Sequence, residues 1–308
     1  MSWSERKTSV AGGDFMKSME KKGVCLAAPA VLGFLIFYVL PMGVTLWQSV
    51  SYGGIFVGLE NYRITFENHM FRLAVGNTLR FLGVALPLIL VIALGLALLL
   101  AEKFPGNRFF RLILLYPMLV PVAATVMVVQ IFLGTRGVLN TFLIQWGFSR
   151  QDWIYSSWAF LILVLLYLWK NTGYAVILLL AGLAMIPREY MEMARMDGAG
   201  RWKCLYYIRL PLLGPMILFT ALISLLNAFK CFREAILIGG NYPHESIYML
   251  QHYMTNNFNN MNYMEISVTS TFIFLVIFIA ACILGRSFFA GKGGKRGSEN
   301  KKKSAHLR

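Results

Sequence analysis

The sequence predicts an all-α integral membrane protein with six transmembrane helices. Of its 308 residues, 57% are apolar and only 14% are charged, which leaves too little polar surface to cover a soluble protein of this size. Two long runs, 81–101 and 112–133, contain no charged residue. Because a helix needs about 20 residues to cross the hydrocarbon core, each run is long enough to span a bilayer.

Four further stretches are also long and apolar enough to be transmembrane helices. Two of them carry charges inside the predicted helix: Lys170 lies in one, and Lys230, Arg233 and Glu234 lie in the other. In chain order the six predicted spans are 24–50, 81–101, 112–133, 158–185, 212–238 and 266–289.

Lysine and arginine are distributed unequally between the predicted loops and tails. If the six spans alternate in direction, one side carries 21 of these residues and the loops on the other side carry five. The positive-inside rule then predicts that both termini are cytoplasmic. Dividing the span around Lys170 into two helices would move the basic C-terminal tail outside, so the count favours six spans. The 21 residues lie in segments 1–23, 102–111, 185–211 and 285–308.

This topology divides the chain into a cytoplasmic N-terminal tail at 1–23, a six-helix transmembrane domain at 24–289 and a basic cytoplasmic tail at 290–308. The net charge of +15 indicates contact with anionic lipids of the inner leaflet. Nucleic acid is not an expected partner, because no aromatic residues alternate with the basic ones.

The predicted cytoplasmic loop 185–211 contains a short helix with clear boundary signals. Pro187 suits its first turn, Glu189 favours the positive N-terminus, and Gly198 suits a left-handed residue after the last turn. Glu192, Met193 and Met196 would lie along one side of this helix, which is typical of a projection that enters another protein's groove. An amphipathic helix lying flat at the lipid interface is the alternative interpretation.

The spacing inside this loop favours the first interpretation. Glu192 and Ala194 are followed after three residues by Gly198, and after nine more by Ile208, one further residue and the pair 210–211, Leu-Pro. This pattern resembles the EAA loop of bacterial ABC importer permeases. Met193 stands where that family usually has a second alanine, which would leave the docking surface intact and alter its packing.

The resemblance covers almost the whole chain and points to the MalF-like carbohydrate-uptake branch, which implies a MalF/MetI-like permease fold for residues 24–289. Only the terminal tails lie outside it. The segments that carry it are 56–59 with 61–62 after the first span, 77–78, 169–174 and 180–183 in the fourth span, and Phe232 with 239–240 and Pro243 around the end of the fifth.

This resemblance implies the permease subunit of an importer in the bacterial plasma (inner) membrane, translocating a sugar or oligosaccharide. The expected partners are a second homologous permease, two ATPase subunits that bind ATP and Mg, and an extracellular solute-binding protein. No phosphate-binding GxxxxGK[ST] loop occurs in this chain, so we expect no catalytic residue, no metal and no cofactor in it. The residues expected to contact the ATPase are Glu189, Glu192, Met193, Ala194, Asp197, Gly198 and Ala199.

Charged and polar residues inside the spans are candidates for the substrate path. A charge near the middle of the bilayer costs about 2.5 to 3.5 kcal/mol, so Lys170 should face protein or water, either in the path or in a structural ion pair. In the fifth span a polar stripe predicts either a sealed helix interface or a mixed role in solute binding. The stripe consists of Thr220, Ser224, Asn227, Cys231 and Glu234.

Lys230 borders this stripe, and its four-residue spacing from Glu234 would let the two neutralise one another. Arg233 would then bind elsewhere. Sugars need hydrogen-bonding side chains and aromatic faces. The full set of substrate-path candidates is Asn171, Lys170, Asn227, Phe229, Lys230, Phe232, Arg233 and Glu234.

The loop 239–265, predicted on the outer side, is rich in tyrosine and asparagine and contains no lysine or arginine. The resemblance implies that it helps to meet the solute-binding protein, but it could equally fold over the mouth of the pore. The four histidines, His69, His244, His252 and His306, all lie in predicted loops or the tail, where we expect them to be solvated.

Two other classes of function are compatible with a six-helix membrane protein. A secondary transporter driven by an ion gradient would use Lys230, Arg233 and Glu234 as coupling residues, but it leaves the bracketed cytoplasmic helix unexplained. A membrane-embedded enzyme ranks last, since no metal-ligand cluster, nucleophile motif or pair of catalytic carboxylates is evident in the sequence.

Overall fold

A computed structural model describes residues 26–102 and 105–305 of the chain. Within that range, six helical segments are long and apolar enough to cross a membrane, as the sequence predicts. The basic N-terminal tail at 1–23 lies outside the described residues. The six segments are Leu26–Val50, His69–Ala101, Val122–Gln145, Trp158–Ala184, Arg201–Gly239 and Tyr263–Ile283.

The described residues fall into two compact units. The first unit runs to Thr65 and also includes Asn262–Phe272, and the second comprises Phe66–Met261 and the residues from Ile273 onward. The first unit contains the π-helical turn η1 (Leu35–Val39), α2 (Leu40–Val50), strands β1 (Ser51–Tyr52) and β2 (Ile55–Phe56), most of α3 (Glu60–Glu67) and the start of α14 (Tyr263–Ala305).

A small polar network closes the first unit after α2. The antiparallel strands β1 and β2 are joined at Gly53 and Gly54, which both adopt positive φ angles that favour glycine. Asn61 is buried, and its side-chain amide donates hydrogen bonds to the backbone oxygens of Ser49 (3.2 Å) and Ser51 (3.0 Å). The segment that resembles the family signature therefore fixes the turn at the end of the first span.

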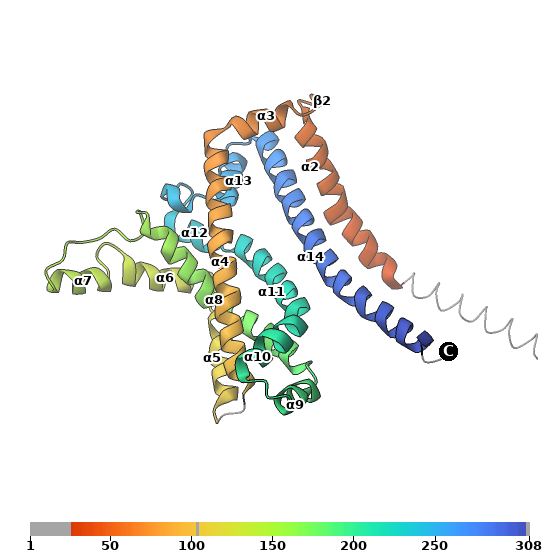
Figure 1. The fold of residues 1–308 in the computed structure, drawn as a ribbon. Coiled ribbons are helices and arrows are strands. Elements are labelled where there is room, and N and C mark those ends of the chain that lie inside the picture. The colour runs from red at the N-terminus through yellow and green to blue at the C-terminus, as the bar shows by residue number, and fades with distance from the viewer. Residues whose placement is uncertain (1–25, 103–104, 306–308) are drawn as a thin grey trace, which may run out of the picture. The chain divides into compact units, whose positions relative to one another are not determined.

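The second unit is built around α4 (His69–Ala101) and α8 (Trp158–Ala184), which pack along one another (Figure 1). Every fourth residue of α4 faces this interface, and most are alanines, which allow the two helices to approach closely. Tyr167 of α8 is buried against them, with its ring edge-on to Phe81 at 5.6 Å between centroids. The buried α4 residues are Phe81, Ala85, Ile89, Ala93 and Ala97.

Helix α4 is longer than the second predicted span, since it begins at His69 and not at residue 81. Its 33 residues extend about 50 Å at 1.5 Å per residue, well beyond a hydrocarbon core of about 30 Å. The side chain of Asn68 caps its first turn by accepting a hydrogen bond from the Met70 amide at 2.9 Å. Hydropathy detects the apolar part alone, and it misses the polar turns that continue the same helix.

The third predicted span, 112–133, is wrong as a single straight helix. Helix α5 (Asn107–Leu119) packs along α8, and the chain then breaks at Val120 and Pro121 before α6 (Val122–Leu133) and α7 (Val138–Gln145). Proline has no amide hydrogen, and it disfavours helical angles in the residue before it, which explains the extended ψ of 128° at Val120. Helices α6 and α7 lead away from the α4–α8 pair (Figure 1).

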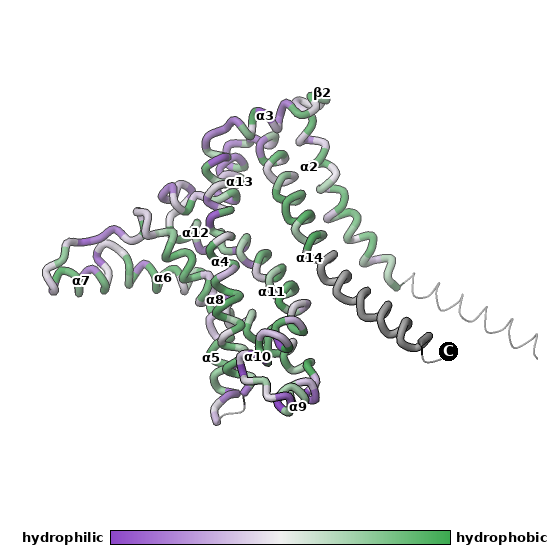
Figure 2. The backbone as a smooth tube through the Cα atoms, in the orientation of Figure 1, coloured by the Kyte–Doolittle hydropathy of each residue, from purple (hydrophilic) through white to green (hydrophobic). Residues whose placement is uncertain are grey.

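The fifth span is also interrupted. It is preceded by α9 (Arg188–Met196), α10 (Arg201–Cys204) and a π-helical turn, η2 (Leu205–Arg209). Helix α11 (Leu210–Lys230) then ends at Cys231, and α12 (Phe232–Gly239) continues from there. The predicted loop 239–265 contains the short helix η3 (Glu245–Ile247) and α13 (Leu250–Asn259), which packs against α4. Figure 2 shows α9 as a hydrophilic segment beside the hydrophobic helices α8 and α11.

Candidate docking surface and transport pathway

Helix α9 ends in a Schellman motif that its sequence encodes. Gly198 has a φ angle of +77°, the left-handed conformation that the sequence predicts. The Ala199 amide donates to the Ala194 carbonyl at 2.9 Å, and the Gly198 amide donates to the Arg195 carbonyl at 3.0 Å. The alanine and glycine spacing of the loop therefore serves a structural purpose, because these residues close the helix and turn the chain toward α10.

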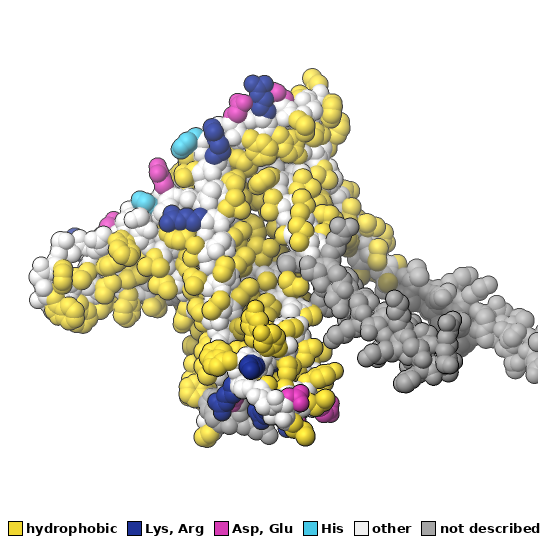
Figure 3. Space-filling view, viewed as in Figure 1, with side chains coloured by type: hydrophobic (Ala, Val, Ile, Leu, Met, Phe, Trp, Pro, Cys, Tyr) yellow, Lys and Arg dark blue, Asp and Glu magenta, His cyan; other side chains and the backbone are white. Residues whose placement is uncertain are grey.

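The two faces of α9 differ in chemistry. Glu189, Glu192, Met193 and Met196 are exposed, with Met193 63% and Met196 87% accessible to solvent. Asp197 and Gly198 are exposed as well, whereas Ala194 and Ala199 are half-buried. In Figure 3, charged side chains gather at the end of the second unit that carries α9 and α10. The structure thus presents an uncovered surface that combines carboxylates with flexible methionines.

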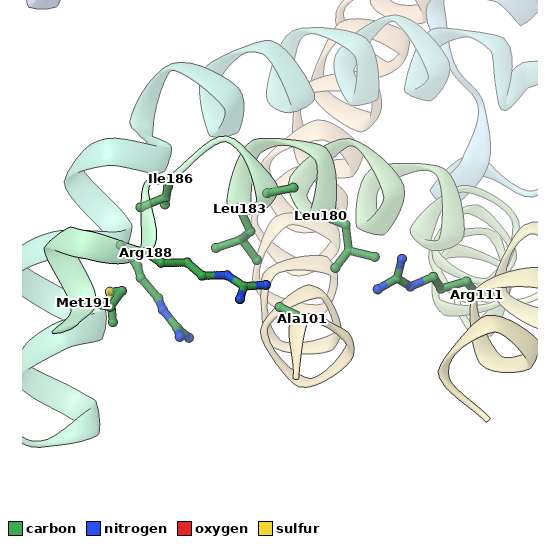
Figure 4. Close-up of a pocket in the computed structure, with 9 residues that line it drawn as sticks. Ala101, Arg111, Leu180, Leu183, Ile186, Arg188 and Met191 are labelled. Atoms are coloured by element: carbon green, nitrogen blue, oxygen red, sulfur yellow. The ribbon is translucent and has the colours of Figure 1, made fainter. Parts of the chain in front are cut away.

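Three arginines line a pocket of about 390 Å³ beneath α9: Arg111, Arg188 and Arg209. Figure 4 shows Arg188 and Arg111 extending toward one another from opposite sides, over Leu180 and Leu183 of α8. In the sequence these arginines serve only as topology signals. Nothing in the linear order shows that they share one pocket, because they come from three separate segments.

Inside the membrane domain, Lys170 of α8 and Glu234 of α12 form an ion pair. The Lys170 Nζ lies 2.7 Å from the Glu234 Oε1, and their side chains are only 16% and 8% exposed. The predicted pairing of Lys230 with Glu234 is wrong. The helix break at Cys231 separates those two residues, and Lys230 is exposed while Glu234 turns inward toward α8.

The polar stripe of α11 and α12 is largely an interface with α8. Thr220, Ser224, Cys231 and Glu234 are buried, and only Asn227 is half-buried. The Tyr167 hydroxyl donates to the Ser224 backbone oxygen at 2.7 Å, which joins α8 to α11. These contacts favour the interpretation that the stripe seals a helix interface.

The remaining substrate-path candidates occupy different environments. Lys230 and Arg233 are exposed, whereas Phe229, Phe232 and Asn171 are half-buried. The Asn171 amide donates to the Tyr167 carbonyl at 3.0 Å within α8. The structure therefore gathers Lys170 and Glu234 into one cluster and leaves the two other cations of the fifth span uncovered around the helix break.

The segment that contains η3 and α13 folds onto α4 through Asn77 and Thr78, two residues of the family resemblance. The Asn77 amide donates to the backbone oxygens of Glu245 and Tyr248, and the Leu250 amide donates to the Thr78 hydroxyl at 3.1 Å. Within the second unit these bonds anchor η3 and the start of α13 to α4.

Arg80, which the sequence does not single out, lies in α4 just before the run 81–101. Its guanidinium carbon lies 4.3 Å from the centre of the Phe160 ring of α8. A cation over an aromatic face contributes about 0.5 to 2 kcal/mol, depending on how far the pair is removed from water. In the sequence, the only sign of this contact is that an arginine stands directly before an apolar run.

His252 of α13 is not the solvated loop histidine that the sequence predicts. It is 0% exposed, and its Nδ1 accepts a hydrogen bond from the Met249 amide at 3.1 Å. Phe232 meets its ring edge-on, and Tyr248 stacks on it. Burial lowers the pKa of His252 to about 4, because the charged imidazolium is poorly solvated there.

Acidification should therefore loosen the packing of α13 against α12. In the unfolded chain His252 has a pKa of about 6.5 and binds a proton below that pH. In the folded protein His252 stays neutral until the pH approaches 4. Stability is thus fully present above pH 6.5, and we expect a loss of about 2 kcal/mol between pH 7 and pH 5. Thermal unfolding in detergent should show this loss, and the variant His252→Gln should show less of it. An unchanged pH profile in that variant would contradict the assignment.

Comparison with known proteins agrees with this geometry. The family model described as binding-protein-dependent transport system inner membrane component matches residues 89–291, a range that includes the whole α9 loop. The sulfoquinovosyl glycerol transport system permease protein SmoG of Agrobacterium fabrum (strain C58) is 29% identical over 269 residues, which cover 84% of this chain and 87% of that protein. The arabinooligosaccharides transport system permease protein AraP of Bacillus subtilis (strain 168) is also 29% identical, covering 89% of this chain and 92% of that protein.

The fold has close counterparts among solved structures. A chain of a bacterial ABC transporter involved in the import of the acidic polysaccharide alginate matches with a TM-score of 0.77 and 23% identity, covering 90% of this chain and 99% of that chain. The part of the chain that the structure describes has six apolar helices and the short helix α9, and its fold is MalF/MetI-like. It belongs to the binding-protein-dependent transport system inner membrane component family, and it is a multi-pass inner-membrane permease subunit of an ABC importer.

Proposed function

We propose that this permease translocates a sugar or oligosaccharide that an extracellular solute-binding protein delivers. It pairs with a second homologous permease subunit to complete the pathway. Two separate ATPase subunits bind ATP and Mg and supply the energy through contacts with α9. The names of the relatives SmoG and AraP, which refer to sulfoquinovosyl glycerol and arabinooligosaccharides, support this substrate class.

The exposed face of α9 is the observation that carries the ATPase part of the proposal. A helix fixed at its end by a Schellman motif can transmit a push without unwinding, because its last carbonyls are already bonded. Glu192 and Met193 project from it into solvent, where they would contact a partner. The distribution of lysine and arginine predicts that this loop lies on the cytoplasmic side together with both termini.

Reversing the charge at Glu192 tests the docking role. We expect Glu192→Lys to reduce uptake at least tenfold, because a lysine in a groove that accepts a carboxylate loses an ion pair and adds repulsion. The conservative variant Glu192→Asp should retain most uptake. Uptake of radiolabelled sugar by cells and ATP hydrolysis by the purified transporter should fall together in Glu192→Lys, while immunoblotting should show an unchanged amount of permease in the membrane.

Normal transport by Glu192→Lys would contradict the docking role of α9.

A second measurement addresses the rival mechanism, a secondary transporter driven by an ion gradient. Uptake should also collapse when the ATPase subunit is deleted, and uptake that persists on an ion gradient would favour a secondary transporter. The structure gives that rival little support, since the Glu234 carboxylate is already paired with Lys170.

A further inference from the structure

The pocket beneath α9 collects positive charge where the spans end. Ala101 is the last residue of α4 and Ala184 is the last residue of α8, and both line the pocket together with Arg111, Arg188 and Arg209. The pocket thus lies at the level where helices leave the hydrocarbon core. Lipid phosphate groups lie at the same level of a bilayer.

A second pocket of about 400 Å³ continues this basic surface. It is lined by Arg195, Arg201 and Arg209, and among its described lining residues only Glu102 is acidic. Arg209 and Met191 line both pockets. The acidic residues of α9 line neither pocket, so the inner side of the loop is strongly cationic while its outer face is acidic.

The three arginines of the first pocket differ in their partners within the described part of the chain. Arg111 is held in place, because its Nε donates to the Asn107 side-chain oxygen at 2.7 Å and its Nη2 donates to the Leu100 carbonyl at 2.9 Å. Among the residues that the structure describes, no carboxylate forms an ion pair with Arg188 or Arg209. Guanidinium groups that share one pocket repel one another unless an anion lies between them.

The floor of the pocket is apolar. Leu180, Leu183 and Ile186 lie between the arginines, as Figure 4 shows. An inorganic anion would use only the guanidinium groups, whereas a phospholipid would place its phosphate on the arginines and its glycerol and upper acyl carbons on the leucines. Arginine is well suited to this contact because its planar group donates two parallel hydrogen bonds to a phosphate.

We propose that Arg111, Arg188 and Arg209 form a binding site for the phosphate group of an anionic phospholipid. The lipid lies beneath α9 and steadies the base of the loop, so that lipid composition influences coupling. Its placement in the inner leaflet rests on the proposed orientation of the permease. The site itself does not depend on which solute is transported.

Native mass spectrometry of the assembled transporter, with the full-length permease, tests this site. We expect the wild-type complex to bind dioleoylphosphatidylglycerol about tenfold more tightly than dioleoylphosphatidylcholine. The double variant Arg188→Gln/Arg209→Gln should bind phosphatidylglycerol about 100-fold more weakly than wild type, since each of the two lost charged hydrogen bonds to phosphate accounts for a factor of about ten. Arg111 stays unchanged in this experiment because it also ties α5 to the end of α4.

A matched control separates the site from general charge. The control variant Arg108→Gln/Lys203→Gln also removes two positive charges, but from exposed positions of α5 and α10 that line neither pocket. This variant should bind phosphatidylglycerol as wild type does, and an equal loss would overturn the proposal. Equal binding by wild type and Arg188→Gln/Arg209→Gln would also overturn it, because the partner ATPase or another group would then occupy the arginines.

Competition distinguishes a lipid from a free anion. Inorganic phosphate at about 10-fold excess over phosphatidylglycerol should displace little of the lipid, because it gains nothing from the apolar floor. Complete displacement would overturn the lipid assignment. Because the readout is lipid binding, its failure is distinct from a failure of sugar uptake.

Discussion

Replacing Gly173 with alanine should prevent stable packing of α5 against α8. A Cβ at this position would lie 1.7 Å from the Leu114 carbonyl oxygen and 2.4 Å from its carbon, both backbone atoms of α5. Backbone cannot move aside as a flexible side chain can, so the two helices must separate. We expect a loss of about 3 kcal/mol or more in the free energy of unfolding, with little permease remaining in the membrane.

Two other glycines make this prediction sharp. A Cβ added at Gly83 of α4 would have no atom within 4 Å, so Gly83→Ala should be neutral or slightly stabilising. A Cβ at Gly182 of α8 would lie 2.7 to 2.8 Å from the side chains of Met216 and Leu213, which can adjust, so Gly182→Ala should fall between the two. Thermal unfolding in detergent should give the highest unfolding temperature for Gly83→Ala, an intermediate one for Gly182→Ala and the lowest for Gly173→Ala. Wild-type stability of Gly173→Ala would show that α5 lies farther from α8.

Removing one partner of the Lys170–Glu234 ion pair should be nearly as damaging. Lys170→Met would leave the Glu234 carboxylate buried and without its cation, and the Glu234 Oε2 already has no hydrogen-bond partner among the described residues. Such a loss costs about 3 to 5 kcal/mol in buried pairs. We expect Lys170→Met to lower the unfolding temperature and to reduce uptake through the loss of folded protein.

The double variant Lys170→Met/Glu234→Gln tests whether the ion pair stabilises the fold or takes part in the transport pathway. With both charges removed, no unpaired ion remains, so we expect stability and uptake to recover beyond either single variant. The single variant Glu234→Gln completes the double-mutant cycle. A double variant that recovers stability but not uptake would instead place the two side chains in the transport pathway.

The length of the apolar runs was enough to predict six membrane-spanning segments and the helical fold, though not the bounds of the third segment, because crossing a bilayer requires long apolar helices in any tertiary arrangement. The bounds of α9 were also predictable. Pro187 and Gly198 act through their own backbone angles, which depend on local sequence and not on distant contacts.

Interruptions inside the spans were harder to predict. Pro121 marks the break between α5 and α6, but a proline can also lie inside an unbroken helix, as Pro87 does in α4. Which outcome occurs depends on whether neighbouring helices hold the chain straight. The break at Cys231 has no proline or glycine beside it, and no local signal shows it in the sequence.

The partners of polar residues were decided by tertiary structure alone. Spacing on one helix suggested that Glu234 pairs with Lys230, yet its partner is Lys170, 64 positions away. His252 is polar and lies in a predicted loop, yet α12 and α13 bury it. Local sequence determines which residues can form a helix and where it ends. Only the packing of distant segments determines which charges meet, since electrostatic contacts depend on distance in space and not along the chain.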